Sequence, residues 1–69
     1  MIAMLTTAEL QVLQYLPTRM SFDEIGTYLL APREIVKSQA IALYRKLGVA
    51  SRAEAVEQAE TLGLLSPHP

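Results

Sequence analysis

The residues of this chain best able to bind another molecule are five cations that lie close together in the sequence. Residues 33–52 contain five basic residues and one acidic residue, a net charge of +4, whereas the rest of the chain holds one basic and six acidic residues, a net charge of −5. A basic segment in an otherwise acidic chain is typical of a surface that binds a polyanion, although a solvated basic helix has the same charge count. The five cations are Arg33, Lys37, Arg45, Lys46 and Arg52.

Catalytic and metal-binding chemistry has no comparable signal. The sequence has no cysteine, and its single histidine, His68, is flanked by prolines and has no carboxylate or thiol beside it. We find no nucleophile–base pair, glycine-rich phosphate loop or metal-ligand spacing. We therefore expect a protein that is not an enzyme and binds no cofactor or metal. The lack of cysteine and of a signal peptide fits the cytoplasm, and no apolar run reaches the roughly 18 residues of a membrane span.

Four helices are expected to position the basic segment, and their ends carry capping signals. In a capping box a Ser or Thr side chain accepts a hydrogen bond from the N3 amide, and a Glu at N3 returns to the N-cap amide. Pro32 suits the first turn of a helix, and Gly48 suits the left-handed residue that follows the last turn. The predicted helices are 7–16, 22–29, 32–47 and 52–62. The capping boxes pair Thr6 with Glu9, Ser21 with Glu24 and Ser51 with Glu54.

Apolar residues spaced three and four apart give each expected helix one buried face. The core is expected over about residues 5–65, so that the chain of 1–69 is one all-α domain. The expected core residues are Leu10, Val12, Leu13, Tyr15, Leu16, Ile25, Tyr28, Leu29, Val36, Ala40, Leu43, Leu47, Ala55, Val56, Ala59, Leu62, Leu64 and Leu65.

The connection between the second and third helices is short. Only Leu30 and Ala31 separate the second helix from Pro32, so the two helices must meet at a steep angle. This is a helix-turn-helix arrangement, whose second helix enters the major groove of DNA. The face of the third helix opposite the core carries side chains able to reach phosphates and base edges, namely Arg33, Glu34, Lys37, Ser38, Ile41 and Arg45.

These residues, in this order and spacing, closely resemble the LuxR-type (GerE-like) DNA-binding domain, in the branch found at the C-termini of large actinobacterial regulators. The resemblance covers about residues 5–65. It is carried by Leu5-Thr6-x-x-Glu9-x-x-Val12-Leu13, Ser21-x-x-Glu24-Ile25, Val36-Lys37-Ser38-Gln39, Arg45-Lys46-Leu47-Gly48-Val49-x-Ser51-Arg52-x-Glu54-Ala55-Val56 and Leu62-Gly63-Leu64-Leu65.

The resemblance implies a tetrahelical helix-turn-helix domain that binds double-stranded DNA in a sequence-specific way, as the output domain of a transcriptional regulator. It implies that the third helix, about 32–47, lies in the major groove, with Lys37 and Ser38 at bases or nearby phosphates. Ser21 is then the N-cap of the helix that crosses the DNA backbone. Arg45 and Lys46 are expected to steer the domain and anchor it to phosphates, with Arg52 as a further candidate for this role, and Arg33 is expected to contact DNA.

The resemblance also implies a homodimer that forms on DNA through the fourth helix, for which Ala53, Val56 and Glu57 are the candidate contacts. A domain of this size without a sensor region is expected to be part of a longer regulator, with an upstream sensor or nucleotide-binding domain.

Two side chains of the third helix keep alternative roles. Gln39 could bind adenine in a bidentate way, or have a structural or phosphate-side role. Ile41 could meet a thymine methyl group, or pack at an interface. Asp23 and Ile35 stand where the family carries residues better suited to phosphate. They favour an alternative function, in which the helix-turn-helix is degenerate and serves as a protein-interaction or dimerisation module with little DNA affinity.

Overall fold

The computed structural model describes residues 4–65, so the expectation for His68 lies outside the described residues. Within this range the chain forms four helices and no strand. The all-α, four-helix fold predicted from the sequence is confirmed, and every helix begins and ends within one residue of its expected bounds. The helices are α1 (Thr7–Tyr15), α2 (Phe22–Leu29), α3 (Arg33–Leu47) and α4 (Arg52–Thr61).

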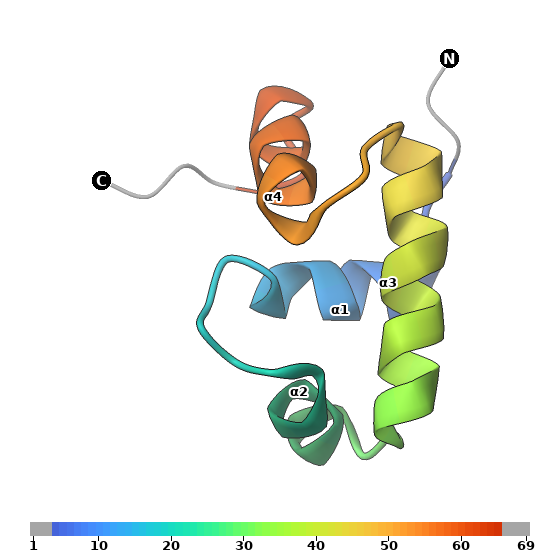
Figure 1. Ribbon diagram of the computed structural model, residues 1–69. Helices are drawn as coiled ribbons and strands as arrows, with labels where there is room; N and C mark the ends of the chain where they lie inside the picture. Colours follow the sequence, from blue (N-terminus) through green and yellow to red (C-terminus); the bar gives the residue numbers. More distant parts are fainter. Residues whose placement is uncertain (1–3, 66–69) are drawn as a thin grey trace.

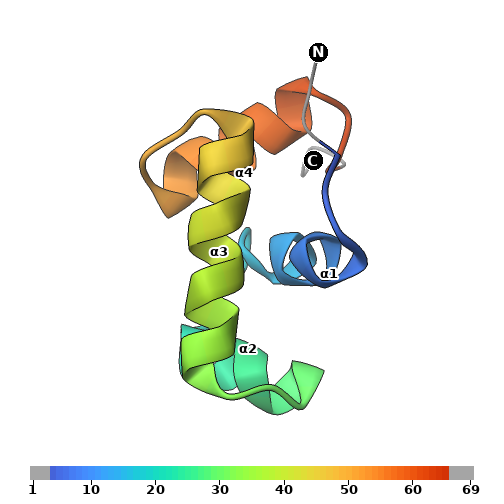
Figure 2. The same cartoon turned by 90° about the vertical axis from the view of Figure 1, so that its right-hand side faces the viewer.

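The longest helix, α3, is the element against which the other three pack. Along its axis, α2 lies beside its N-terminal end, α1 crosses its middle and α4 lies near its C-terminal end (Figure 1 and Figure 2). Because all three partners lie on one side of α3, its other side is covered by none of the other three helices.

The capping boxes predicted at α1 and α2 are complete, whereas the one at α4 is partial. Thr6 and Ser21 each accept from the N3 amide of their helix, and the N3 glutamate returns to the N-cap amide in both. At α4 the Ser51 side chain accepts from the amide of Glu54. The Glu54 carboxylate instead accepts from the Ala50 amide at 3.2 Å, one residue before the N-cap. The box at α4 is therefore shifted by one residue.

The turn between α2 and α3 consists of residues 30–32. Leu30 adopts the left-handed conformation with φ of 56°. The amides of Leu30 and Ala31 both donate to the carbonyl of Gly26, the latter at 2.9 Å. Pro32 is the N-cap of α3. The sequence predicted Pro32 in the first turn of this helix, whereas the helix begins one residue later, at Arg33.

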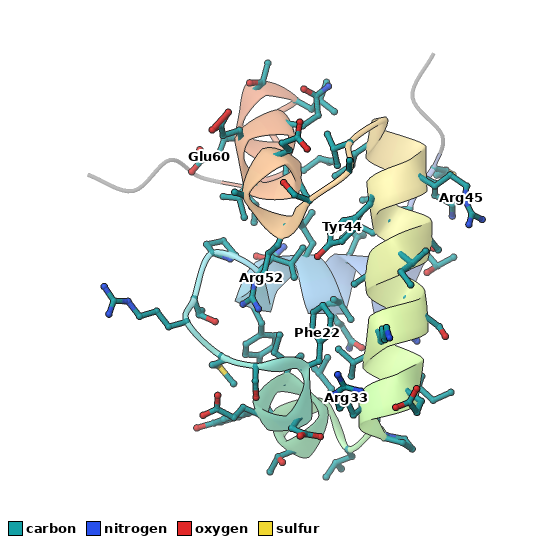
Figure 3. The ribbon with its side chains drawn as sticks, viewed as in Figure 1. Phe22, Arg33, Tyr44, Arg45, Arg52 and Glu60 are labelled. Carbon is teal, nitrogen blue, oxygen red and sulfur yellow. The ribbon has the colours of Figure 1, made fainter. Side chains whose placement is uncertain are left out.

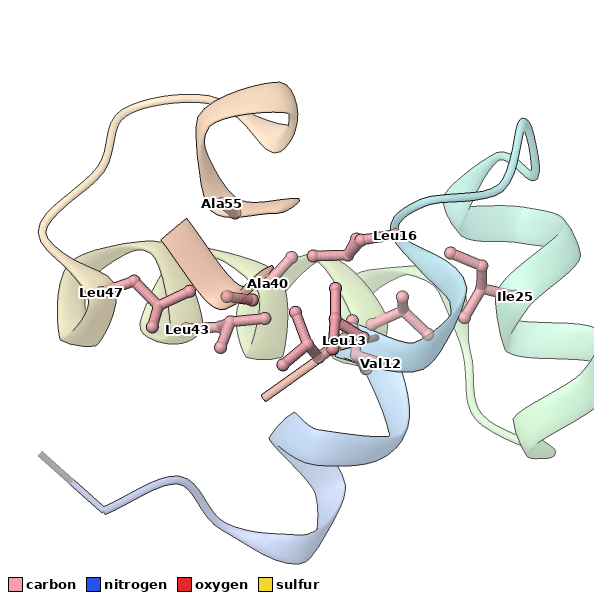
Figure 4. Packing of buried hydrophobic residues seen from close by; sticks show 11 residues of the cluster. Val12, Leu13, Leu16, Ile25, Ala40, Leu43, Leu47 and Ala55 are labelled. Carbon is pink, nitrogen blue, oxygen red and sulfur yellow. The ribbon is translucent and has the colours of Figure 1, made fainter. Parts of the chain in front are cut away.

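The core lies where α1, α2 and α4 meet α3. All four residues predicted to form the buried face of α3 are buried, and two alanines of α4 belong to the same cluster (Figure 4). The buried hydrophobic residues are Val12, Leu13, Leu16, Ile25, Val36, Ala40, Leu43, Leu47, Ala55, Ala59 and Leu65.

The prediction that Leu10 and Tyr28 belong to the core is wrong. Leu10 is 37% exposed, because the buried stripe of α1 begins at Glu9 and continues three, four and seven residues later, which leaves Leu10 at its edge. Tyr28 is 69% exposed, and its ring stacks on that of Tyr15 with 6.1 Å between the centroids. The expected core residues that are only half-buried pack against the core from its margin, namely Tyr15, Leu29, Val56, Leu62 and Leu64.

Candidate nucleic-acid interface

The outward face of α3 is built by helical spacing. Because an α-helix turns about 100° per residue, Ser38, Ile41 and Arg45 form a stripe opposite the buried one. All three are exposed. Arg45 extends away from the body of the domain (Figure 3). These side chains therefore meet solvent from the part of α3 that no other helix covers.

Two further cations of α3 are exposed outside this stripe. Lys37 is exposed and lies one turn before Ile41. Arg33, at the start of α3, forms an exposed ion pair with Glu34 at 3.1 Å. Exposed pairs of this kind contribute little to stability, so the Arg33 guanidinium remains able to exchange this partner for another anion. Among residues 4–65, Lys37 and Arg45 take part in no ion pair.

Gln39 and Ser21 lie at the margins of the face. Gln39 is half-buried, which leaves only part of its side chain accessible to a ligand. Ser21 is exposed at the N-cap of α2, where its hydroxyl oxygen accepts from the Glu24 amide at 3.2 Å. A hydroxyl that accepts in a cap can still donate its own proton to an anion.

Lys46 differs from the other predicted cations, because its ammonium is engaged inside the domain. It donates to the Glu9 carboxylate at 2.8 Å and to the carbonyl of Met4 at 3.2 Å. The same Glu9 oxygen accepts from the Thr6 amide at 2.9 Å. Lys46 therefore joins the C-terminal part of α3 to the start of α1.

Glu9 is the one charged residue that is buried within residues 4–65, with 5% of its surface exposed. The hydrogen bond from Lys46 is the main reason that the pKa of its carboxyl group lies below the ordinary value of 4.5. Burial acts in the opposite direction, and the bonds from Thr6 add to the lowering. Glu9 is therefore ionised at neutral pH and needs its cation.

Arg52, the last cation of the basic segment, holds the end of α1. Its guanidinium donates to the carbonyls of Leu16 at 2.9 Å, Tyr15 at 3.2 Å and Thr18 at 3.0 Å. It also lies over the ring of Phe22, 5.9 Å from the centroid (Figure 3).

A local signal in the sequence points to this role of Arg52. A cation in the first turn of a helix is unfavourable for the helix dipole, whereas a cation near unsatisfied C-terminal carbonyls is favourable. Arg52 lies in the first turn of α4, and α1 has no basic residue in its own last turn. Arg52 is thus unfavourably placed for the dipole of α4, but its guanidinium binds the C-terminal carbonyls of α1.

The face that remains has fewer available cations than the sequence suggested. Of the five basic residues in 33–52, Lys46 and Arg52 are bound internally, which leaves Arg33, Lys37 and Arg45 at the surface. Within residues 4–65 no three His, Cys, Asp or Glu side chains gather as metal ligands. No helix in this range is long and apolar enough to cross a membrane.

The residues predicted for dimerisation lie on α4. Ala53 and Glu57 are exposed, and Val56 is half-buried against the core. Glu54 is also exposed on this helix. The accessible part of α4 is therefore small and acidic.

Comparisons of the chain with protein-family models, curated proteins and solved structures find no match.

Proposed function

We propose that this chain is a DNA-binding domain of the LuxR type, which binds double-stranded DNA sequence-specifically as the output domain of a transcriptional regulator. The observation that carries the proposal is the uncovered face of α3, with Lys37, Ser38 and Arg45 exposed directly after a tight helix-turn-helix connection. The major groove is about 12 Å wide and admits one α-helix. In this proposal α3 enters the groove as the recognition helix.

The proposed contacts follow from the position of each side chain. Lys37 and Ser38, in the N-terminal half of α3, reach base edges, and Arg45 reaches a phosphate. Ser21 and the first amides of α2 meet the DNA backbone, because a helix N-terminus attracts phosphate. Lys46 acts indirectly in this proposal, by fixing α3 against α1 through Glu9.

Replacing Lys37 with alanine tests the proposal. We expect specific binding to weaken by about 1–3 kcal/mol if Lys37 contacts a base, and binding to all duplexes to weaken with a shallower salt dependence if it contacts phosphate. With two or three phosphate contacts, the wild-type log–log salt slope should be roughly −2 to −3. Fluorescence anisotropy on selected and random duplexes across a salt series measures both quantities.

Arg19→Ala is the matched control for this experiment. Arg19 is exposed in the segment between α1 and α2, whose middle part lies away from α3, and its removal changes the net charge equally (Figure 1). We expect a smaller effect than that of Lys37→Ala on both duplexes. Equal affinities for wild type and Lys37→Ala would contradict the assignment of α3 as the recognition helix.

The second candidate function is a protein-interaction module that retains the helix-turn-helix fold. The internal bonds of Lys46 and Arg52 favour it, since they remove two of the five cations from the surface. Leu30 also favours it, because this residue is 93% exposed at the turn. A flat salt dependence of duplex binding would support this candidate, because binding without phosphate contacts releases no counterions.

We also propose that the free domain is monomeric at micromolar concentration and pairs only on DNA, through α4. A two-fold interface sets each patch against its own copy, so that the exposed Glu54 and Glu57 would repel their symmetry mates near the axis. One short helix also offers less than the roughly 1,200 Å² of total area buried in stable complexes. Sedimentation equilibrium should give the monomer mass without DNA. A tight free dimer would show that another surface mediates assembly.

A further inference from the structure

Ile41 is an apolar side chain at the centre of the outward face of α3, and the contacts proposed above give it no role. Ile41 is 45% exposed, and within residues 4–65 it belongs neither to the core nor to the side chains packed against it. One helical turn before it are Lys37 and Ser38, and one turn after it is Arg45, all exposed. An isoleucine in water thus stands between two cations on the same face.

The surrounding charges indicate which kind of partner could cover Ile41. An apolar protein surface would have to remove water from Lys37 and Arg45 as it covered the isoleucine, and unpaired buried charges are costly. DNA offers both cations a partner, because phosphates flank the groove and base edges in it carry acceptor atoms. An apolar group between two cations therefore fits a polyanion better than an apolar protein.

The major groove offers one apolar group to such a side chain. Among the four base pairs, thymine alone presents a methyl group there, at C5, and the rest of the groove floor consists of hydrogen-bond donors and acceptors. A 5-methylcytosine carries the same methyl group at the same ring position. Apolar side chains contact this methyl group favourably.

We infer that Ile41 recognises the 5-methyl group of a pyrimidine in the major groove, and so makes the domain prefer thymine or 5-methylcytosine at one position of its site. The inference rests on the proposed function, because it requires α3 to lie in the groove. Ile41 then adds a base preference to the contacts proposed for Lys37 and Arg45.

The test compares bases that differ only in the methyl group. Duplexes are selected with the wild-type chain from a random pool and from a pool in which every cytosine is 5-methylated. Each thymine of the enriched site is then replaced by uracil, and each 5-methylcytosine by cytosine. Removal of the methyl group at one position should weaken binding about fourfold, the effect of losing one buried methyl-sized group. The two pools show which pyrimidine supplies the methyl group.

Ile41→Ala should bind methylated and unmethylated bases equally at that position, while Ile35→Ala should keep the fourfold ratio. Ile35 is a matched control because it is 46% exposed on the same helix but lies roughly 120° further round its axis. Thermal melts serve as the folding control, and we expect both variants to be folded because both positions are exposed. A ratio of one at every position, or a ratio that survives in Ile41→Ala, would overturn the inference. Absence of duplex binding by the wild-type chain would instead reject the proposed function itself.

Discussion

Replacing Gly26 with alanine should destabilise the domain by about 1–3 kcal/mol, even though alanine favours helices more than glycine does. A Cβ at this position would meet the carbonyl oxygen of Ala31 at a separation that real Cβ atoms essentially never show. The obstacle is backbone, so no side-chain rotation can relieve it. The carbonyl oxygen of Gly26 itself accepts hydrogen bonds from the amides of Leu30 and Ala31, which fixes the turn against α2. The substitution therefore forces the helix-turn-helix connection to open.

Thermal unfolding followed by circular dichroism measures this effect, at roughly 4–8 °C per kcal/mol for a domain of this size. Thr27→Ala is the control, because Thr27 is the next residue of α2 and is exposed. We expect its effect to stay within about 0.5 kcal/mol. A melting temperature for Gly26→Ala equal to or above that of wild type would contradict the close approach of α2 to the turn.

The helices were predictable from sequence because their signals are local. Ser and Thr N-caps, Pro32 and the left-handed Gly48 each act on the backbone within a few residues, and so they place helix ends without knowledge of the tertiary fold. The buried face of α3 was predictable for the same reason, since its apolar spacing repeats over the length of the helix. Leu10 was assigned to the core because its spacing from Leu13 fits a helical stripe equally well.

The candidate site was less predictable, because it depends on which cations form hydrogen bonds or ion pairs within the domain. Lys46 and Arg52 bind groups 34 to 42 residues away in the sequence, and charge counting cannot tell such residues from free ones. Gly26 gave no signal either, since the close approach of Ala31 arises only when the turn has formed. The outward positions of Lys37, Ser38 and Arg45 could be predicted, because they follow from the period of the same helix that buries Val36.

Replacing Lys46 with methionine should destabilise the domain by about 1–3 kcal/mol at pH 7, because it leaves the Glu9 carboxylate buried without its cation. Methionine keeps the apolar length of the lysine side chain, so the loss reports mainly the charge and its hydrogen bonds. We place the value below that of fully buried ion pairs because the Lys46 side chain is 29% exposed. Denaturant unfolding gives the difference directly. Arg45→Met is the control, since Arg45 is the adjacent cation and takes part in no ion pair among residues 4–65; we expect a change within about 0.5 kcal/mol.

The pH dependence of the same pair provides a second measurement. The pKa of Glu9 is lower in the folded domain than its ordinary value of 4.5, so its ionisation stabilises the fold above that pH, and this stability is lost as pH falls through the folded pKa. In Lys46→Met the main cause of the lowering is absent, so the pKa of Glu9 is higher than in the wild-type fold. The gap in unfolding free energy between wild type and Lys46→Met should therefore shrink as the pH falls from the folded pKa of Glu9 in the variant to its lower folded pKa in wild type. Adding Glu9→Gln to Lys46→Met should recover part of the loss at pH 7, because the buried position is then uncharged. A gap that stays constant with pH, or a double variant no more stable than Lys46→Met, would mean that Lys46 stabilises the domain through packing and not through Glu9.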